Sequence, residues 1–114
     1  MIAKENKLKK NKDFKKVFEK AKNFKNNLLV LRVARNNSEK NRFGFIVSSK
    51  VSKKAVIRNR IRRRLLAIIK NQLPSIKEGF DIILIALPSV AAKDFSATER
   101  AAEDILKIGG LIKK

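Results

Sequence analysis

Residues 53–66 of the chain read KKAVIRNRIRRRLL, a stretch that places five arginines and two lysines around three evenly spaced apolar residues. Ile57, Ile61 and Leu65 recur every four residues, so they line one side of a helix. Seen down the same helix, the asparagine and the basic side chains of the stretch fall on the flanks of this apolar side and on the side opposite to it. The stretch therefore predicts a helix that packs along one narrow seam and presents positive charge elsewhere.

Apolar runs flank this helix on both sides. Residues 28–33 and 43–47 are apolar or β-branched and are separated by the turn-rich RNNSEKN, which predicts two neighbouring antiparallel strands. The first of them could begin as early as Phe24. The basic helix continues to about Gln72, before a Leu-Pro pair stops it. Residues 80–87, FDIILIAL, form the nearly continuous apolar run that is typical of a strand covered on both faces.

Two further helices complete the predicted order of elements. Asn11 is placed to cap a helix that ends near Ala21. The last helix opens with the capping-box pattern of residues 96–99, SATE, and ends at Gly109-Gly110. The order is helix, two or three strands, helix, strand, helix, which predicts an α+β fold, a small α/β sandwich with helices packed on one sheet. The length of 114 residues, without repeats or linkers, predicts a single domain over residues 1–114.

The charge of the chain is strongly unbalanced. Lys and Arg number 29 against 10 Asp and Glu, which gives a formal net charge of +19 and a field that attracts polyanions. No acidic residue lies between Glu39 and Glu78, so nothing inside that segment can pair with the basic helix. Arginine forks onto phosphate with paired donors and stacks on bases, which lysine does not do. The basic helix therefore favours RNA or DNA as the partner.

A simpler interpretation of the same run is a solvated basic face or a localisation-like patch. Three features favour nucleic-acid binding instead. The apolar seam keeps the helix docked on the fold, and the whole chain is basic. The loop before the helix adds Lys50, Lys53 and Lys54 next to the helix N-terminus, whose free N–H groups and dipole also attract anions.

The run AVIRNRIRRRL resembles the signature of the protein subunit of bacterial ribonuclease P. Three other stretches agree with that family in order and spacing: LKKNKDFKKVF near the N-terminus, GFIVSSK before the run, and GFDIILIA after it. The resemblance covers nearly the whole chain. It implies one mostly antiparallel sheet in which the basic helix joins two parallel strands through a left-handed strand-helix-strand crossover, against the usual right-handed rule.

The resemblance also implies which residues bind RNA. Matched residue by residue, the family's motif and its basic lead-in fall on Lys50, Lys53, Lys54, Arg58, Asn59, Arg60, Arg62 and Arg63. Phe14 and Phe18 match the aromatics that line the family's cleft for the single-stranded 5′ leader, although their helical spacing alone favours packing in the core. Leu66, Ser49 and Leu87 stand where many relatives carry a basic residue, which weakens the transfer of individual RNA contacts.

The chain offers no predicted catalytic residue and no predicted metal ligand set. It contains no His and no Cys, and its carboxylates are scattered, so a general base, a nucleophile relay or a two-metal site is hard to assemble. In the family, the RNA subunit is the catalyst and holds the Mg²⁺. The resemblance thus implies an accessory subunit of an endoribonuclease that removes 5′ leaders, with the catalytic RNA and precursor tRNA as partners and no small-molecule substrate.

Two other classes of function stay open at this point. A structural RNA-binding protein of the ribosomal type has the same size and charge. A cationic helix on a membrane surface is disfavoured by the flanking strands and by the absence of Trp. The absence of cysteine and of any apolar run near 20 residues predicts a cytoplasmic protein without a membrane segment.

Overall fold

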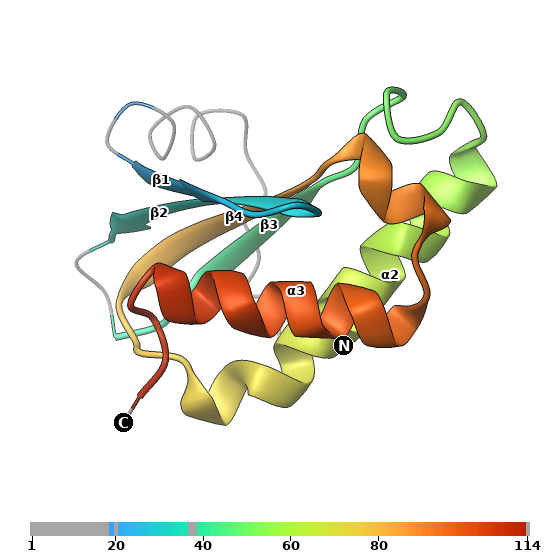
Figure 1. Cartoon of the computed structure of the whole chain (residues 1–114). Coiled ribbons are helices and arrows are strands. Elements are labelled where there is room, and N and C mark those ends of the chain that lie inside the picture. The colour runs from blue at the N-terminus through green and yellow to red at the C-terminus, as the bar shows by residue number, and fades with distance from the viewer. Residues whose placement is uncertain (1–18, 20, 37–38, 114) are drawn as a thin grey trace.

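The computed structural model describes residues 19, 21–36 and 39–113, and shows one four-stranded sheet packed against two helices (Figure 1). The strands are β1 (Lys22–Lys25), β2 (Leu29–Arg35), β3 (Arg42–Ile46) and β4 (Phe80–Ala86). The helices are α2 (Ala55–Gln72) and α3 (Phe95–Ile108), and short 3₁₀ segments follow α2 and β4. The predicted α+β class and the basic helix are confirmed. The expected helix over about 11–21 lies almost entirely outside the described residues.

The order of strands in the sheet is β1-β2-β4-β3. β1 pairs with β2, and β2 with β4, in antiparallel fashion, whereas β3 and β4 are parallel. The prediction that residues 28–33 and 43–47 are neighbours is therefore wrong, because β4 lies between them. β4 is the most apolar strand, and the centre of the sheet is where such a strand loses most contact with water.

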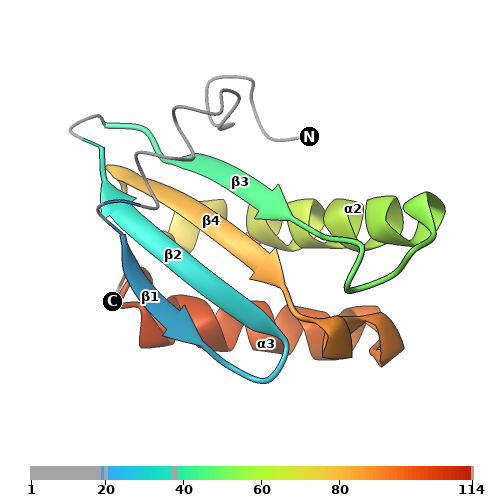
Figure 2. The same ribbon diagram turned by 90° about the horizontal axis from the view of Figure 1, so that it is seen from above.

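The connection between the two parallel strands runs through the basic helix. In Figure 2 the sheet faces the viewer and α2 lies behind it. The β3 and β4 arrows point to the right in Figure 2, with β4 below β3. When the picture is turned so that the arrows point upward, β4 lies to the right of β3 with α2 behind the sheet, so the β3-α2-β4 crossover is left-handed. The mostly antiparallel sheet and the unusual crossover both agree with the expectation.

Both helices cover the same face of the sheet (Figure 1). Alternate residues of β2 and β4 point toward them, and pairs such as Leu31 with Leu84 stand opposite each other in the register. The helices contribute Ile61, Leu65, Ile68, Ile69, Ala102, Ile105 and Leu106 to this core, all of them buried. The buried seam of α2 thus includes the predicted Ile61 and Leu65, while Ile57 is half-buried at its edge.

The opposite face of the sheet carries a second, smaller apolar cluster. Ile83 of β4 is fully buried there, with Ala21, Ala34, Ile46 and Ile85 packed around it. Side chains alternate between the faces along a strand, so burial of both Ile82 and Ile83 means that β4 is covered on both sides. This agrees with the interpretation of FDIILIAL.

Hydrogen bonds and one ion pair fix the start of β4 between its neighbours. Asp81 is buried and accepts two hydrogen bonds from the Arg42 guanidinium, from Nε at 2.8 Å and from Nη2 at 2.7 Å. Asn36 Nδ2 donates to the same carboxylate at 3.0 Å. Asn41 Oδ1 accepts from Phe80 N at 2.9 Å, and Asn41 Nδ2 donates to Lys77 O at 2.7 Å. The ends of β2, β3 and β4 are thereby held in one register.

The ends of α3 differ in part from the prediction. Its N-cap is Asp94, whose carboxylate accepts from Ala97 N at 2.8 Å, and Ser96 lies inside the helix rather than capping it. The C-cap is Gly109, as expected. A Cβ on Gly109 would lie 2.6 Å from Leu31 Cδ2, so the missing side chain allows the end of α3 to approach β2. Gly110 follows with φ 71°, a left-handed conformation that glycine adopts without strain.

Candidate nucleic-acid interface

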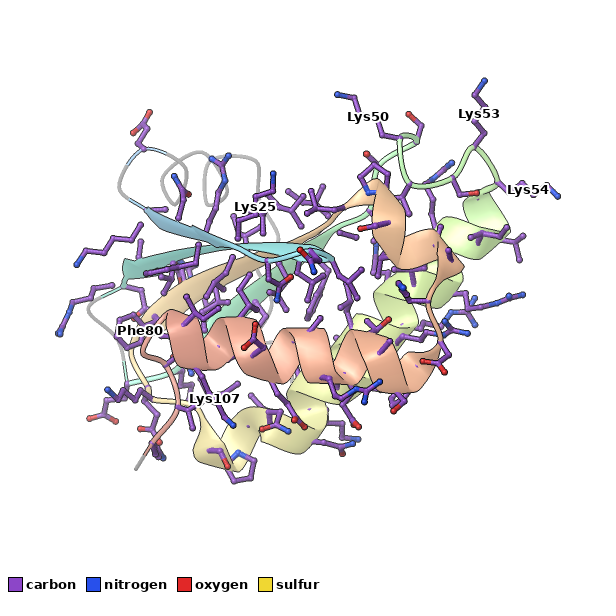
Figure 3. The ribbon with its side chains drawn as sticks, viewed as in Figure 1. Lys25, Lys50, Lys53, Lys54, Phe80 and Lys107 are labelled. Carbon is purple, nitrogen blue, oxygen red and sulfur yellow. The ribbon has the colours of Figure 1, made fainter. Side chains whose placement is uncertain are left out.

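The loop before α2 presents the three predicted lysines. Lys50, Lys53 and Lys54 are exposed, and their side chains project outward from the loop and the first turn of α2 (Figure 3). The buried side chain of Val51 anchors the loop, and Val51 N donates to Ser48 O at 3.0 Å. The lysines therefore stand on a fixed turn rather than on an extended tail.

The N-terminus of α2 is open to an external anion. Its N-cap is Lys54, which makes no side-chain capping hydrogen bond, and the first turn contains no acidic residue. The N–H groups at a helix start need acceptors, and the helix dipole adds positive potential there. The capped start of α3 shows the opposite arrangement in the same protein. The uncapped end and the three lysines together make a site suited to phosphate groups.

The predicted residues on α2 fall into two groups. Asn59, Arg60, Arg62 and Arg63 are exposed, away from the buried seam. Arg62 Nη1 donates to Asn59 Oδ1 at 2.8 Å, which orients that guanidinium along the helix surface. Arg58 is half-buried, and its Nη1 donates to Ser52 O at 2.9 Å. Arg58 thus connects α2 to the lysine-bearing loop.

The eight predicted RNA-binding residues all lie on the loop before α2 or on its N-terminal half; seven of them are exposed and Arg58 is half-buried. Phe14 and Phe18, the residues predicted to line the leader cleft, lie outside the described residues. Arg64 is half-buried on the same helix, and its Nη1 donates to Lys93 O at 3.3 Å.

Comparisons with known proteins show the family to which the chain belongs. The family profile described as Ribonuclease P matches residues 2–109. A ribonuclease P protein component from Clostridium botulinum is 39% identical over 109 residues, covering 95% of this chain and 97% of the relative. The chain belongs to the ribonuclease P protein family. A second relative of the same name, from Synechocystis, is 37% identical over 88% of this chain and 82% of its own length.

Solved structures of ribonuclease P proteins share the fold as well. A Staphylococcus aureus protein, described as a mutant with defective mRNA degradation activity, superposes with a TM-score of 0.90 at 29% identity. The match covers 96% of this chain and 92% of that protein. The Thermotoga maritima protein gives a TM-score of 0.82 at 26% identity, over 90% of this chain and 96% of that one.

Two of the three departures from the ribonuclease P pattern are half-buried, and the third is exposed. Leu66 is half-buried and packs against the main core, so this position supports the fold here instead of presenting a charge. Leu87 is half-buried at the end of β4, where its N–H donates to Leu28 O at 2.9 Å. Ser49 is exposed in the basic loop, and nothing in the structure explains its replacement of a basic residue.

The described part of this ribonuclease P protein contains neither a cluster of metal-binding side chains nor a membrane-spanning helix. Among those residues, no three side chains of the metal-binding types lie close enough to hold an ion together. Within the same residues, no helix has the length and apolar character needed to cross a membrane.

One part of the surface was missed by the sequence reasoning. Phe95, at the first position of α3, is 39% exposed beside the arginines of α2, and Val56 nearby is 60% exposed. Phe95 lies three residues before the buried Thr98, so the two residues fall on the same side of the helix. The spacing therefore predicts a core position for Phe95, and its exposure is not evident from the sequence.

We expect sulfate to raise the Tm of the free protein more than chloride does at equal ionic strength. Sulfate can bind at the lysine loop and the uncapped helix start, and ligand at ten times its Kd adds about 1.4 kcal/mol to the free energy of unfolding. The combined variant Lys50→Ala/Lys53→Ala/Lys54→Ala is the control. General salt exclusion acts on both proteins alike. Equal responses of the two proteins to sulfate would contradict an anion site at this loop.

Proposed function

We propose that the chain binds the catalytic RNA of ribonuclease P through the surface formed by the loop of residues 48–54 and the outer side of α2. Membership of the family makes it the protein subunit of an endoribonuclease. The observation that carries the proposal is the grouping of three loop lysines, an uncapped helix start and exposed arginines on one acid-free segment. Such a surface neutralises closely spaced phosphates and releases their counterions.

The substrate side of the proposal concerns precursor tRNA. Phe14 and Phe18 are proposed to contact the single-stranded 5′ leader, since exposed aromatic rings stack on bases with little dependence on sequence. Accepting leaders of many sequences requires that tolerance. By holding both the catalytic RNA and the leader, the protein reduces the repulsion between two polyanions. The site of action is proposed to be the cytoplasm, where precursor tRNA is processed.

The cleavage chemistry is proposed to belong to the catalytic RNA and not to the protein. Mg²⁺ bound mainly by the RNA subunit supplies the activation of water for hydrolysis of the phosphodiester between leader and mature tRNA. The protein's own residues bind and orient the two RNAs. Their positive charge lowers the cost of bringing phosphates together and so favours Mg²⁺ binding by the assembled RNA.

Reconstitution of the full chain with the catalytic RNA and precursor tRNA tests this function. We expect no cleavage by the protein alone, and a several-fold lower Mg²⁺ requirement for cleavage at the 5′ end of the mature tRNA when protein is added to the RNA. The protein should also raise the preference for precursor over mature tRNA. Cleavage at low Mg²⁺ is measured by gel electrophoresis of end-labelled precursor.

Two control reactions separate this function from its alternatives. Capture of ribosomal RNA, with no effect on the catalytic RNA, would instead support a structural RNA-binding protein. Because the Staphylococcus aureus mutant is described as defective in mRNA degradation activity, a protein-only reaction with mRNA is included. The Arg60→Ala/Arg63→Ala protein, purified in the same way, is the control for contaminating nuclease. A contaminant would cleave the RNA in that preparation as well, whereas an activity of the protein itself should fall when the two arginines are removed.

A further inference from the structure

A shallow cavity of about 500 Å³ lies between the arginine side of α2 and the start of α3. Its lining is made of Val56, Arg60, Arg63, Arg64, Ala67 and Phe95. The described residues include three large hydrophobic side chains that are exposed, Val56, Phe95 and Ile108, and two of these three are in this cavity. The cavity therefore combines an apolar floor with three guanidinium groups.

The backbone at Phe95 is held in place by the start of α3. The Asp94 carboxylate accepts from Ala97 N at 2.8 Å, and Asp94 O accepts from Thr98 Oγ1 at 3.0 Å. The residue before the cap is tied to α2, because Arg64 Nη1 donates to Lys93 O. These contacts fix Phe95 at the first helical position while 39% of it remains exposed.

The chemistry of this lining is suited to a nucleobase. An exposed ring and aliphatic carbons offer a flat apolar surface, and guanidinium groups bind phosphate and also stack on bases. Asp94 is the carboxylate adjacent in sequence to Phe95, and it is engaged in capping α3. The described lining residues contain no acidic side chain that would repel RNA. The volume falls within the range of about 300–1,000 Å³ that is usual for pockets holding small organic groups.

We propose that the cavity between α2 and α3 holds an unpaired nucleobase of the catalytic RNA. The base stacks on Phe95 and contacts Val56, while Arg60 and Arg63 bind the phosphates on either side of it. This inference rests on the proposed function and adds a stacking contact that the basic motif does not contain. It makes Phe95 a residue that selects an unpaired segment of RNA over a regular duplex.

A fluorescence experiment tests the stacking directly. The chain contains no Trp and no Tyr, so Phe95→Trp introduces a single indole reporter in the full-length protein. Titration with the catalytic RNA should quench this fluorescence in proportion to the bound fraction measured independently by filter binding. Ile108→Trp is the matched control, because Ile108 is exposed at the opposite end of α3, and its fluorescence should change little.

Affinity measurements give a second, independent readout. Phe95→Ala should weaken binding of the catalytic RNA by roughly tenfold, the usual effect of losing one stacked base. The dependence of binding on salt should stay as in the parent protein, because no charge is removed. Ile108→Ala should leave the affinity unchanged, and Phe95→Leu should behave like Phe95→Ala because it also lacks the ring.

The outcomes distinguish this inference from the function on which it rests. If the parent protein binds the catalytic RNA but the indole at position 95 does not respond, no base stacks there and the inference is wrong, while the function stands. If Phe95→Ala lowers Tm and leaves RNA affinity unchanged, the ring serves packing alone, which also overturns the inference. A parent protein that binds no catalytic RNA overturns both.

Discussion

Replacement of Arg60 and Arg63 together by Ala is expected to weaken binding of the catalytic RNA by roughly 100-fold at moderate salt, since each guanidinium can make charge-assisted hydrogen bonds to phosphate. Both side chains are exposed and lie away from the buried seam of α2. In a plot of log affinity against log salt concentration, the magnitude of the slope should fall by about 2, because each lost phosphate contact contributes about 0.9. Filter binding over a salt series measures both quantities.

The control for this effect is Lys70→Ala, which removes one positive charge from the last turn of the same helix. If the RNA contacts are concentrated at the N-terminal half of α2, Lys70→Ala should weaken binding far less than either arginine variant. Thermal unfolding should show nearly the same Tm for all of these proteins. A loss of affinity accompanied by an equally large loss of stability would mean that the arginines support the fold rather than contact RNA.

Asp81→Ala should have the largest effect on stability, lowering the free energy of unfolding by about 3 kcal/mol. The Asp81 side chain is 7% exposed and that of Arg42 is 32% exposed, so removing the carboxylate deletes two charge-assisted hydrogen bonds that are largely shielded from water. Asn36 loses an acceptor as well. Thermal unfolding should show a Tm lower by roughly 10 °C for a chain of this length.

A double substitution separates the cost of a lone charge from the value of the ion pair. In Arg42→Leu/Asp81→Leu both partners are replaced, so no uncompensated charge stays in the interior and stability should recover in part. Asp81→Asn should be milder than Asp81→Ala, because its amide oxygen can still accept a hydrogen bond. A Tm of Asp81→Ala within about 2 °C of the parent would show that the ion pair contributes little.

The local features of the fold were predictable, and its long-range pairing was not. The spacing of Ile57, Ile61 and Leu65 was enough to predict α2, and the continuous apolar run was enough to predict β4. The turn-rich residues between β2 and β3 suggested a hairpin, because adjacent strands usually pair. In the sheet, β4 replaces β3 as the partner of β2. Nothing local to β2 or β3 encodes this pairing. The left-handed crossover was predicted only from the family resemblance.

The site was predictable where it depends on helical spacing and charge. Exposure of Arg60 and Arg63 follows from their angular distance from the seam, and the structure agrees. The function of Arg58 in holding Ser52 O depends on how the loop folds back, which residue types do not reveal. Phe95 was missed because its exposure depends on where α3 begins: the N-cap is Asp94 and not Ser96, so Phe95 is the first residue of the helix.

The position of β4 affects the order in which the molecule is made. β4 is a central strand of the sheet, yet it is synthesised after β1, β2, β3 and α2. When synthesis has reached the end of α2, the whole arginine helix is present. β4, the strand that lies between β2 and β3 in the sheet, has not yet been made. Such distant pairing slows folding, since loop-closure entropy opposes it until the last strand arrives. The arginine helix is therefore synthesised before the sheet on which it packs can be completed.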